Sequence, residues 1–199
     1  MTEPPTLDSK DAILDAAQML IAQHGFAGFS IRDLSRESGL AKGTIYHHFQ
    51  DKREIYQSVM ERDLAQFEGV LQEAVAGAED PAAWLDAFVH AYLRQAAEQR
   101  SHIRVLLREL GAMEDEMRHM AQRVRERVAA PVAAVIERGS AEGYFRPVQP
   151  RIAVLSLIGA LNTYIAWQLV VDEQEIDESV ADAILDFFMQ GIRRRTSND

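Results

Sequence analysis

Apolar residues recur at intervals of three and four positions along most of the chain, which is the spacing of one face of an α-helix. Sustained alternation of apolar and polar residues, which predicts a β-strand, is absent from the sequence. The Asn-Gly and Asp-Gly pairs typical of tight hairpins are absent as well. We therefore expect an all-α protein.

The first part of the chain predicts three helices and the start of a longer fourth one. Ser30 is a good N-cap, with Asp33 placed to complete a capping box, and Gly39 is a helix stop. Asp51 has the same capping character for the fourth helix. The helices expected in this part cover residues 10–24, 30–39, 41–48 and 51–75.

The remainder also predicts helices, and the chain divides into two units. Asp80 followed by Pro81 is a helix start, and Pro131 should kink a long helical segment. The segments expected here are a helix beginning at Pro81, then 101–110, 114–139, 152–171 and 176–194. We expect residues 1–55 to form an N-terminal three-helix domain and residues 56–199 to form a C-terminal helical domain.

The two short helices joined at Gly39 predict a helix-turn-helix, whose second helix projects and fits the major groove of DNA. Five apolar residues are spaced to pack inward: Ile31, Leu34, Leu40, Ile45 and Phe49. The outward residues offer a cation, a hydroxyl, a phenol and an imidazole to phosphates or base edges, and a glycine lets the backbone approach. Two more residues lie at helix starts, where phosphate is favoured. The DNA-contacting candidates are Ser30, Lys42, Gly43, Thr44, Tyr46, His47 and Lys52.

Composition limits how such a protein can bind DNA. The formal net charge is −10 and the pI is about 5.1, so a general attraction to polyanions is excluded. Within 30–53, however, basic residues outnumber acidic ones, which indicates a local contact. The chain has no cysteine, which excludes disulfides and thiolate chemistry, and its first residues are acidic and lack the pattern of a secretory signal. We expect a cytoplasmic protein without a cofactor.

The string GLAKGTIYHHF at residues 39–49, followed by Asp51-Lys52, resembles the DNA-binding domain of the TetR family of bacterial transcriptional regulators. The resemblance extends over residues 26–55. It implies that Thr44, Tyr46, His47 and Lys52 contact phosphates and that Lys42 lies near bases. It also implies a C-terminal domain that binds a small apolar or amphipathic effector and forms a homodimer.

Aromatic and methionine residues in the C-terminal part are open to two interpretations. At helical spacing they fill a core, and in the resembling family they line an effector cavity. Arg104, Arg108 and His90 are polar candidates; the arginines would suit an anionic ligand such as an acyl-CoA, or could pair with Glu98 or Glu109. The effector-binding candidates are Trp84, Phe88, Tyr92, Arg104, Arg108, Met113, Met117, Met120 and Tyr164.

The segment 152–171 carries no charged residue and is long enough to span a bilayer. Polar residues such as Asn162 and Gln168 along it, and the lack of a second apolar segment, argue against a membrane. A helix that is uncharged on all sides must be buried on all sides, and a small domain covers only one face. We therefore expect a homodimer through 152–171 and 176–194. It would set the second helices of the two helix-turn-helix units, here called the reader helices, about 34 Å apart on a palindromic operator.

Two other classes of function are weighed against a ligand-responsive repressor. A di-metal carboxylate enzyme needs two Glu-x-x-His motifs and two further glutamates, whereas the sequence offers one motif at Glu116 and His119. His47 and His48 diverge by about 100° on a helix and do not predict a metal site. A non-enzymatic adaptor that binds another protein through the uncharged helix is the second alternative.

Overall fold

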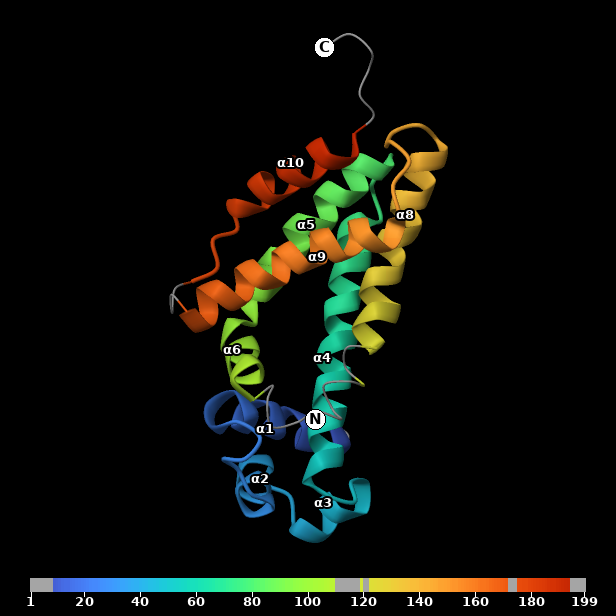
Figure 1. Cartoon of the computed structure of the whole chain (residues 1–199). Coiled ribbons are helices and arrows are strands. Elements are labelled where there is room, and N and C mark those ends of the chain that lie inside the picture. Colours follow the sequence, from blue (N-terminus) through green and yellow to red (C-terminus); the bar gives the residue numbers. More distant parts are fainter. Residues whose placement is uncertain (1–8, 110–118, 120–121, 172–174, 194–199) are drawn as a thin grey trace, which may run out of the picture.

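The computed structural model describes residues 9–109, 119, 122–171 and 175–193, with the backbone only at 102, 105, 106, 108, 109 and 125. Within these ranges the chain is helical apart from loops and one isolated bridge between Phe145 and Arg193, which confirms the all-α prediction (Figure 1). Two π-helical turns, η2 and η3, adjoin helices α8 and α9. The elements are α1 Ser9–His24, α2 Ile31–Ser38, α3 Lys42–His48, α4 Lys52–Val75, α5 Pro81–Glu98, α6 Arg100–Glu109, η2 Arg125–Ala129, α8 Ala130–Ala141, α9 Pro150–Ala166, η3 Trp167–Val171 and α10 Val180–Ile192.

The helix starts follow from local side-chain capping. Asp33 N–H donates to the Ser30 hydroxyl at 3.2 Å, and Ser30 N–H donates to the Asp33 carboxylate at 3.0 Å, which completes the predicted capping box. The Ser30 hydroxyl and backbone hydrogen bonds hold the pKa of Asp33 below its usual value. Asp51 caps α4 and Asp80 caps α5 through their carboxylates, and Gly39 ends α2 in the left-handed region with φ 69°.

Two details differ from the prediction for identifiable reasons. The helix changes from α-helical geometry just before Pro131, which lies in the first turn of α8 directly after the π-helical turn η2, a turn that the sequence did not predict. Proline lacks an N–H and its ring displaces the carbonyl four residues earlier, so the wider turn absorbs the mismatch. The last helix begins at Val180, later than predicted, because Tyr164 holds the preceding loop through the backbone of Asp177. The predicted start of the 114–139 segment lies outside the described residues.

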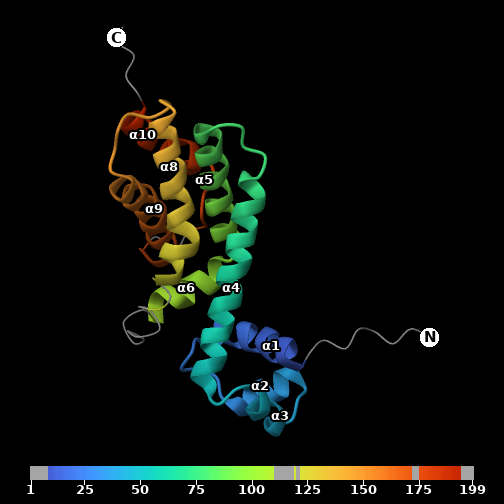
Figure 2. The same ribbon diagram turned by 90° about the vertical axis from the view of Figure 1, so that its right-hand side faces the viewer.

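The buried residues form two separate clusters that share helix α4. The smaller cluster joins α1, α2, α3 and the first part of α4, and it includes Ile13, Leu34 and Ile45. The larger cluster joins the rest of α4 to α5, α8, α9 and α10. Figure 2 shows α4 running from the small unit of α1 to α3 into the larger helical unit, with α6 lying between the two. Helix α4 is thus the element that belongs to both parts.

Helix α5 lies at the centre of the larger unit, in contact with α4, α6, α8, α9 and α10. The loop after α8 closes this unit at the end far from α3 (Figure 1). The ring of Phe145 packs onto Gly139 so closely that a Cβ there would lie 2.3 Å from it. Arg146 N–H then donates to the Ile192 carbonyl at 2.8 Å. This contact fixes the end of α10 against the body of the protein.

Candidate DNA interface and effector unit

Helix α3 is anchored by one face and exposed on the other. Ile45 is completely buried and Phe49 is 2% exposed, and both belong to the same cluster as Leu34 on α2. On the opposite side Tyr46 is 55% exposed, as the helical spacing predicted. Of the other candidates on this helix, Lys42, Gly43 and His47 are exposed and Thr44 is half-buried. The helix therefore presents polar groups at the end of the molecule farthest from α10 (Figure 1).

Gly43 is not required by the packing of the protein itself. A Cβ at this position would meet no atom within 4 Å, so the space beside it is open. Its backbone conformation is one that other residues adopt, since it is not among the glycines with positive φ. A glycine in the first turn of an exposed helix lowers helix stability. Its presence is explained if another molecule approaches the backbone there.

Lys52 has a structural role that the sequence did not predict. Its ammonium group donates to the Phe29 carbonyl and lies 4.3 Å from the centroid of the Phe29 ring and 4.7 Å from that of Phe26. These contacts tie the start of α4 to the loop before α2. Ser30, at the end of that loop, is exposed, with its hydroxyl bonded to Asp33. Both candidates thus hold the backbone at the starts of α2 and α4.

The aromatic candidates on α5 are packed into a column. The rings of Trp84 and Phe88 are stacked with centroids 5.3 Å apart, and Phe88 lies 5.7 Å from Tyr92. Phe67 on α4 meets Tyr92 edge to face at 5.0 Å. The Tyr92 hydroxyl donates to the Asn162 side chain on α9 at 2.8 Å, and burial raises the pKa of Tyr92 to about 12. This column joins α4, α5 and α9 at the centre of the larger unit.

The remaining effector candidates are only partly described. Arg104 Nε on α6 donates to the Leu169 carbonyl in η3 at 3.1 Å, and neighbouring Arg100 pairs with Glu175 at 3.0 Å. Tyr164 lines a shallow surface hollow beside Trp167, in addition to its bonds to the Asp177 backbone. The side chain of Arg108, and the residues Met113, Met117 and Met120, lie outside the described residues.

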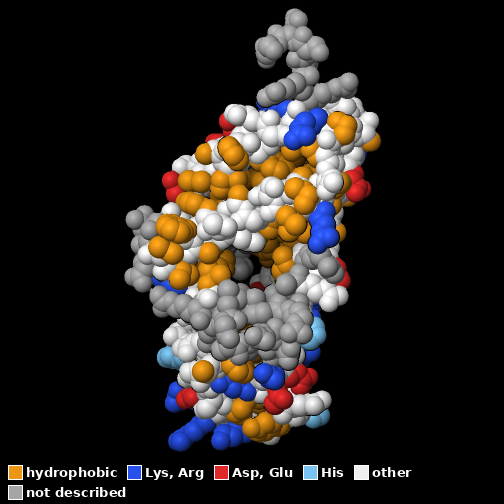
Figure 3. Space-filling model, in the orientation of Figure 1, with side chains coloured by type: hydrophobic (Ala, Val, Ile, Leu, Met, Phe, Trp, Pro, Cys, Tyr) orange, Lys and Arg blue, Asp and Glu red, His pale blue; other side chains and the backbone are white. Residues whose placement is uncertain are grey.

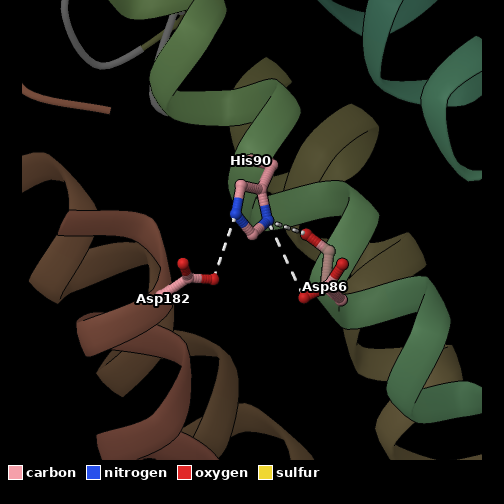
Figure 4. A group of neighbouring side chains, drawn as sticks. All are labelled: Asp86, His90 and Asp182. Carbon is pink, nitrogen blue, oxygen red and sulfur yellow. Dashed lines mark hydrogen bonds and ion pairs between the residues drawn. The ribbon is translucent and has the colours of Figure 1, made fainter. Parts of the chain in front are cut away.

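His90 bridges α5 and α10 at the surface, which sequence reasoning did not anticipate (Figure 4). Its Nδ1 lies 3.0 Å from the Asp86 carbonyl oxygen and its Nε2 lies 3.3 Å from the Asp182 carboxylate. Among the described residues, these three form the one group whose ligand atoms lie near enough to approach a metal ion. The carboxylates lie at different nitrogens of the ring and both are exposed, so the arrangement serves as a polar link between the two helices.

Helices α9 and α10 leave a wide apolar surface uncovered. The inner side of α9 is buried through Leu157, Leu161 and their neighbours, while Phe187 on α10 is 83% exposed. A groove of about 800 Å³ runs between the two helices and the loop 146–149. Figure 3 shows hydrophobic side chains across this face. The other large exposed apolar residues along α9 and η3 are Ile152, Leu155, Trp167, Val170 and Val171.

By length and composition, the stretch Pro150–Val171 is the one helix among the described residues that would be able to cross a membrane. A third of its most apolar window is buried inside the protein. This is weak evidence for a membrane, because a core helix of a soluble protein passes the same test. The prediction that one face is covered by the chain and the other is left open is confirmed by its burial pattern.

Comparison with known proteins gives matches over nearly the whole chain. The family model described as bacterial regulatory proteins, tetR family, matches residues 13–59, and the model described as tetracyclin repressor-like, C-terminal domain, matches residues 78–192. The HTH-type transcriptional repressor KstR2 of Rhodococcus jostii is 28% identical over 73% of this chain and 75% of its own length. The fatty acid metabolism regulator protein of Bacillus subtilis is 22% identical over 92% of this chain and 95% of its own.

Solved structures share the fold. The regulator FadR from Bacillus subtilis in complex with stearoyl-CoA superposes with a TM-score of 0.81, at 20% identity over 92% of this chain and 99% of that one. The fatty acid degradation regulator FadR from Bacillus halodurans gives a TM-score of 0.80, at 22% identity over 98% and 100% of the two chains. At these identities the likeness concerns the arrangement of the helices.

Proposed function

Because this chain belongs to the TetR family of bacterial regulatory proteins, we propose that it is a ligand-responsive repressor that acts as a homodimer on a roughly palindromic operator. That it is a DNA-binding transcriptional regulator follows from the family. The observation that carries the finer proposal is α3, whose inner face is anchored by Ile45 and Phe49 while its polar face is open. This is the form of a helix that enters a DNA groove.

We assign residues 1–55 to DNA binding and residues 56–199 to effector binding and dimerisation. The two separate buried clusters support this division, with α4 shared between them. In the DNA-binding unit the exposed polar face of α3 carries the direct contacts, and the starts of α2 and α4 bind phosphate beside it. The proposed contacts are Ser30, Lys42, Gly43, Thr44, Tyr46, His47 and Lys52.

The homodimer is proposed to form through α9, η3 and α10, near 152–171 and 176–194. The supporting observation is the uncovered apolar surface there, with its groove and the exposed ring of Phe187. Contiguous apolar patches of this kind mark interfaces in soluble proteins, and two helices from each chain make a four-helix interface. Twofold symmetry would place two α3 helices on successive major-groove faces about 34 Å apart.

The effector is proposed to be an amphipathic molecule with a long acyl chain, of the acyl-CoA class. The stearoyl-CoA held by FadR of Bacillus subtilis supports this, since that protein has the same helical arrangement. Figure 3 also shows a hollow below α9 with hydrophobic side chains around it. The described candidates for contact are Trp84, Phe88, Tyr92, Arg104 and Tyr164.

Binding of the effector is proposed to change operator affinity by shifting the spacing of the two reader helices. A ligand that prefers one spacing shifts the population towards it, and a coupling of about 1–3 kcal/mol changes affinity about 5- to 150-fold. Helix α4 is the connection, since it carries residues of both buried clusters.

We assign the protein to the cytoplasm and assign it no reaction and no cofactor. The Glu-x-x-His motif weighed for a metal-carboxylate enzyme consists of Glu116 and His119, and Glu116 lies outside the described residues.

The proposal is tested by measuring binding to the DNA upstream of the protein's own coding sequence over a series of salt concentrations. Lys42→Ala and Tyr46→Ala should weaken binding, because both side chains lie on the open face of α3. Arg193→Ala is the matched control: its side chain is exposed at the end of α10, at the opposite end of the molecule. Equal loss in all three variants would mean nonspecific charge attraction and would contradict the proposal.

A further inference from the structure

Four polar side chains alternate between α1 and α4 where the small unit meets the rest of the protein. The Arg62 guanidinium on α4 donates from Nη1 to the Asp15 carboxylate on α1 at 2.7 Å and from Nη2 to the side-chain oxygen Oε1 of Gln18 at 2.9 Å. The Gln18 amide nitrogen in turn donates to the Asp63 carboxylate at 2.8 Å. The hydrogen bonds therefore link Asp15, Arg62, Gln18 and Asp63 in that order, alternating between α1 and α4. We call these four residues the Arg62 network.

This network is more enclosed than an ordinary surface ion pair. The Arg62 side chain is 20% exposed and Asp63 is 7% exposed, whereas Asp15, at the outer end of the network, is 57% exposed. Partial burial strengthens charge-assisted hydrogen bonds, whereas exposed pairs contribute little. A buried carboxylate also carries a desolvation cost that its hydrogen bonds must offset. Burying the Asp63 carboxylate between α1 and α4 therefore costs free energy, and conformational specificity is one reason for retaining such a group.

The geometry restricts how α1 can lie on α4. The planar guanidinium of Arg62 directs its two hydrogen bonds in one plane. The Gln18 side chain can accept from Arg62 and donate to Asp63 with only one orientation of its amide. Apolar residues of both helices, such as Ile13 and Val59, belong to the same buried cluster, and apolar contacts attract without direction. Apolar packing alone permits α1 to slide or rotate. The Arg62 network selects one arrangement.

The same turn of α4 is held from its other side by the larger unit. Glu61 pairs with Arg123 at 2.9 Å and with Arg127 in η2 at 3.0 Å. Glu68, two turns further along α4, lies 3.7 Å from Arg127. Consecutive residues 61 and 62 therefore bind opposite parts of the protein. A fixed α4 at this turn gives the Arg62 network a firm base on which to orient α1.

We propose that Arg62 is a positioning residue for operator binding, acting through Asp15 and Gln18 to fix the angle at which the unit of α1 to α3 is carried on α4. Its guanidinium is engaged by α1 and is not among the proposed DNA contacts. The inference rests on the proposed DNA-binding function and assigns to these residues the orientation of the unit of α1 to α3. Losing the network would leave α3 folded but distributed over several orientations, and operator affinity would fall.

The test measures orientation and binding separately. The chain has no cysteine, so Glu37→Cys on α2 and Glu73→Cys on α4, both exposed, give a clean pair of spin labels. Labelled chains diluted with unlabelled chains report the distance within one chain, with or without dimerisation. In Arg62→Met we expect a broader distance distribution and, in the unlabelled variant, operator affinity lowered about tenfold, within the range of typical coupling effects. Gln18→Met should give the same changes, and it provides a second variant if Arg62→Met fails to fold.

The matched control is Arg138→Met, which removes an exposed arginine in the last turn of α8, paired with Glu142 just after that helix and far from α1. It should leave the distance distribution and the affinity unchanged. Unchanged distributions in Arg62→Met and Gln18→Met overturn the proposal, and so does a broad distribution with undiminished affinity, which would make the network structural only. If the unaltered protein binds no duplex, the proposed function fails, while the distance measurement still shows whether the network fixes the unit.

Discussion

Replacing Gly43 with alanine should move stability and DNA binding in opposite directions. The residue lies in the first turn of α3, its φ is not positive, and an added Cβ meets nothing within 4 Å. Alanine should therefore stabilise the helix by about 0.5–1 kcal/mol, as is usual for Gly→Ala at a compatible site. For a protein of this size that corresponds to a midpoint of thermal unfolding higher by about 1–4 °C.

Operator binding should weaken because the new methyl group occupies the space that DNA would fill. Loss of one charge-assisted hydrogen bond to a phosphate costs about 1.5–3 kcal/mol, which is a roughly 10- to 150-fold lower affinity. Thermal unfolding followed by circular dichroism and fluorescence anisotropy with labelled operator measure the two effects. Gly69→Ala is the matched control: that exposed glycine lies on α4 with equally open space, so it should gain stability without losing affinity. Unaltered affinity in Gly43→Ala would refute the reasoning.

Three further outcomes are expected. Tyr92→Phe should lower the free energy of unfolding by about 1 kcal/mol through loss of the hydrogen bond to Asn162. The pKa of the Tyr92 hydroxyl is about 12 in the folded protein against 10.0 in the unfolded chain, so the stability that Tyr92 contributes is complete below pH 10 and is lost as the pH rises to 12. Urea titrations of the variant at several pH values should therefore lack this alkaline loss. Gly139→Ala should destabilise by about 1–3 kcal/mol, since its Cβ would overlap the Phe145 ring, and an unchanged unfolding midpoint would contradict the packing described. Phe187→Glu should shift sedimentation towards the monomer; a variant that stays dimeric would place the interface elsewhere.

Local signals in the sequence predicted the helices and the exposed polar face of α3. Ser30, Gly39 and Asp51 act on backbone groups within four residues of themselves, so their effect is readable along the chain and the structure confirms it. The alternation of buried Ile45 and exposed Tyr46 follows from helical geometry alone. The π-helical turn before Pro131 was not predicted, although Pro131 did indicate an irregularity in this helical segment.

The tertiary structure alone decided which distant side chains meet. Arg62 lies 47 positions from Asp15, and the hydroxyl of Tyr92 reaches Asn162, 70 positions along the chain. The side chains of both pairs have several possible partners in the sequence, and no local pattern selects among them. Helical periodicity fixes the face on which a residue lies, whereas the packing of whole helices fixes what that face meets. For this reason the polar face of the proposed DNA-contacting helix was predictable from the sequence, while the network proposed to orient it required the folded chain.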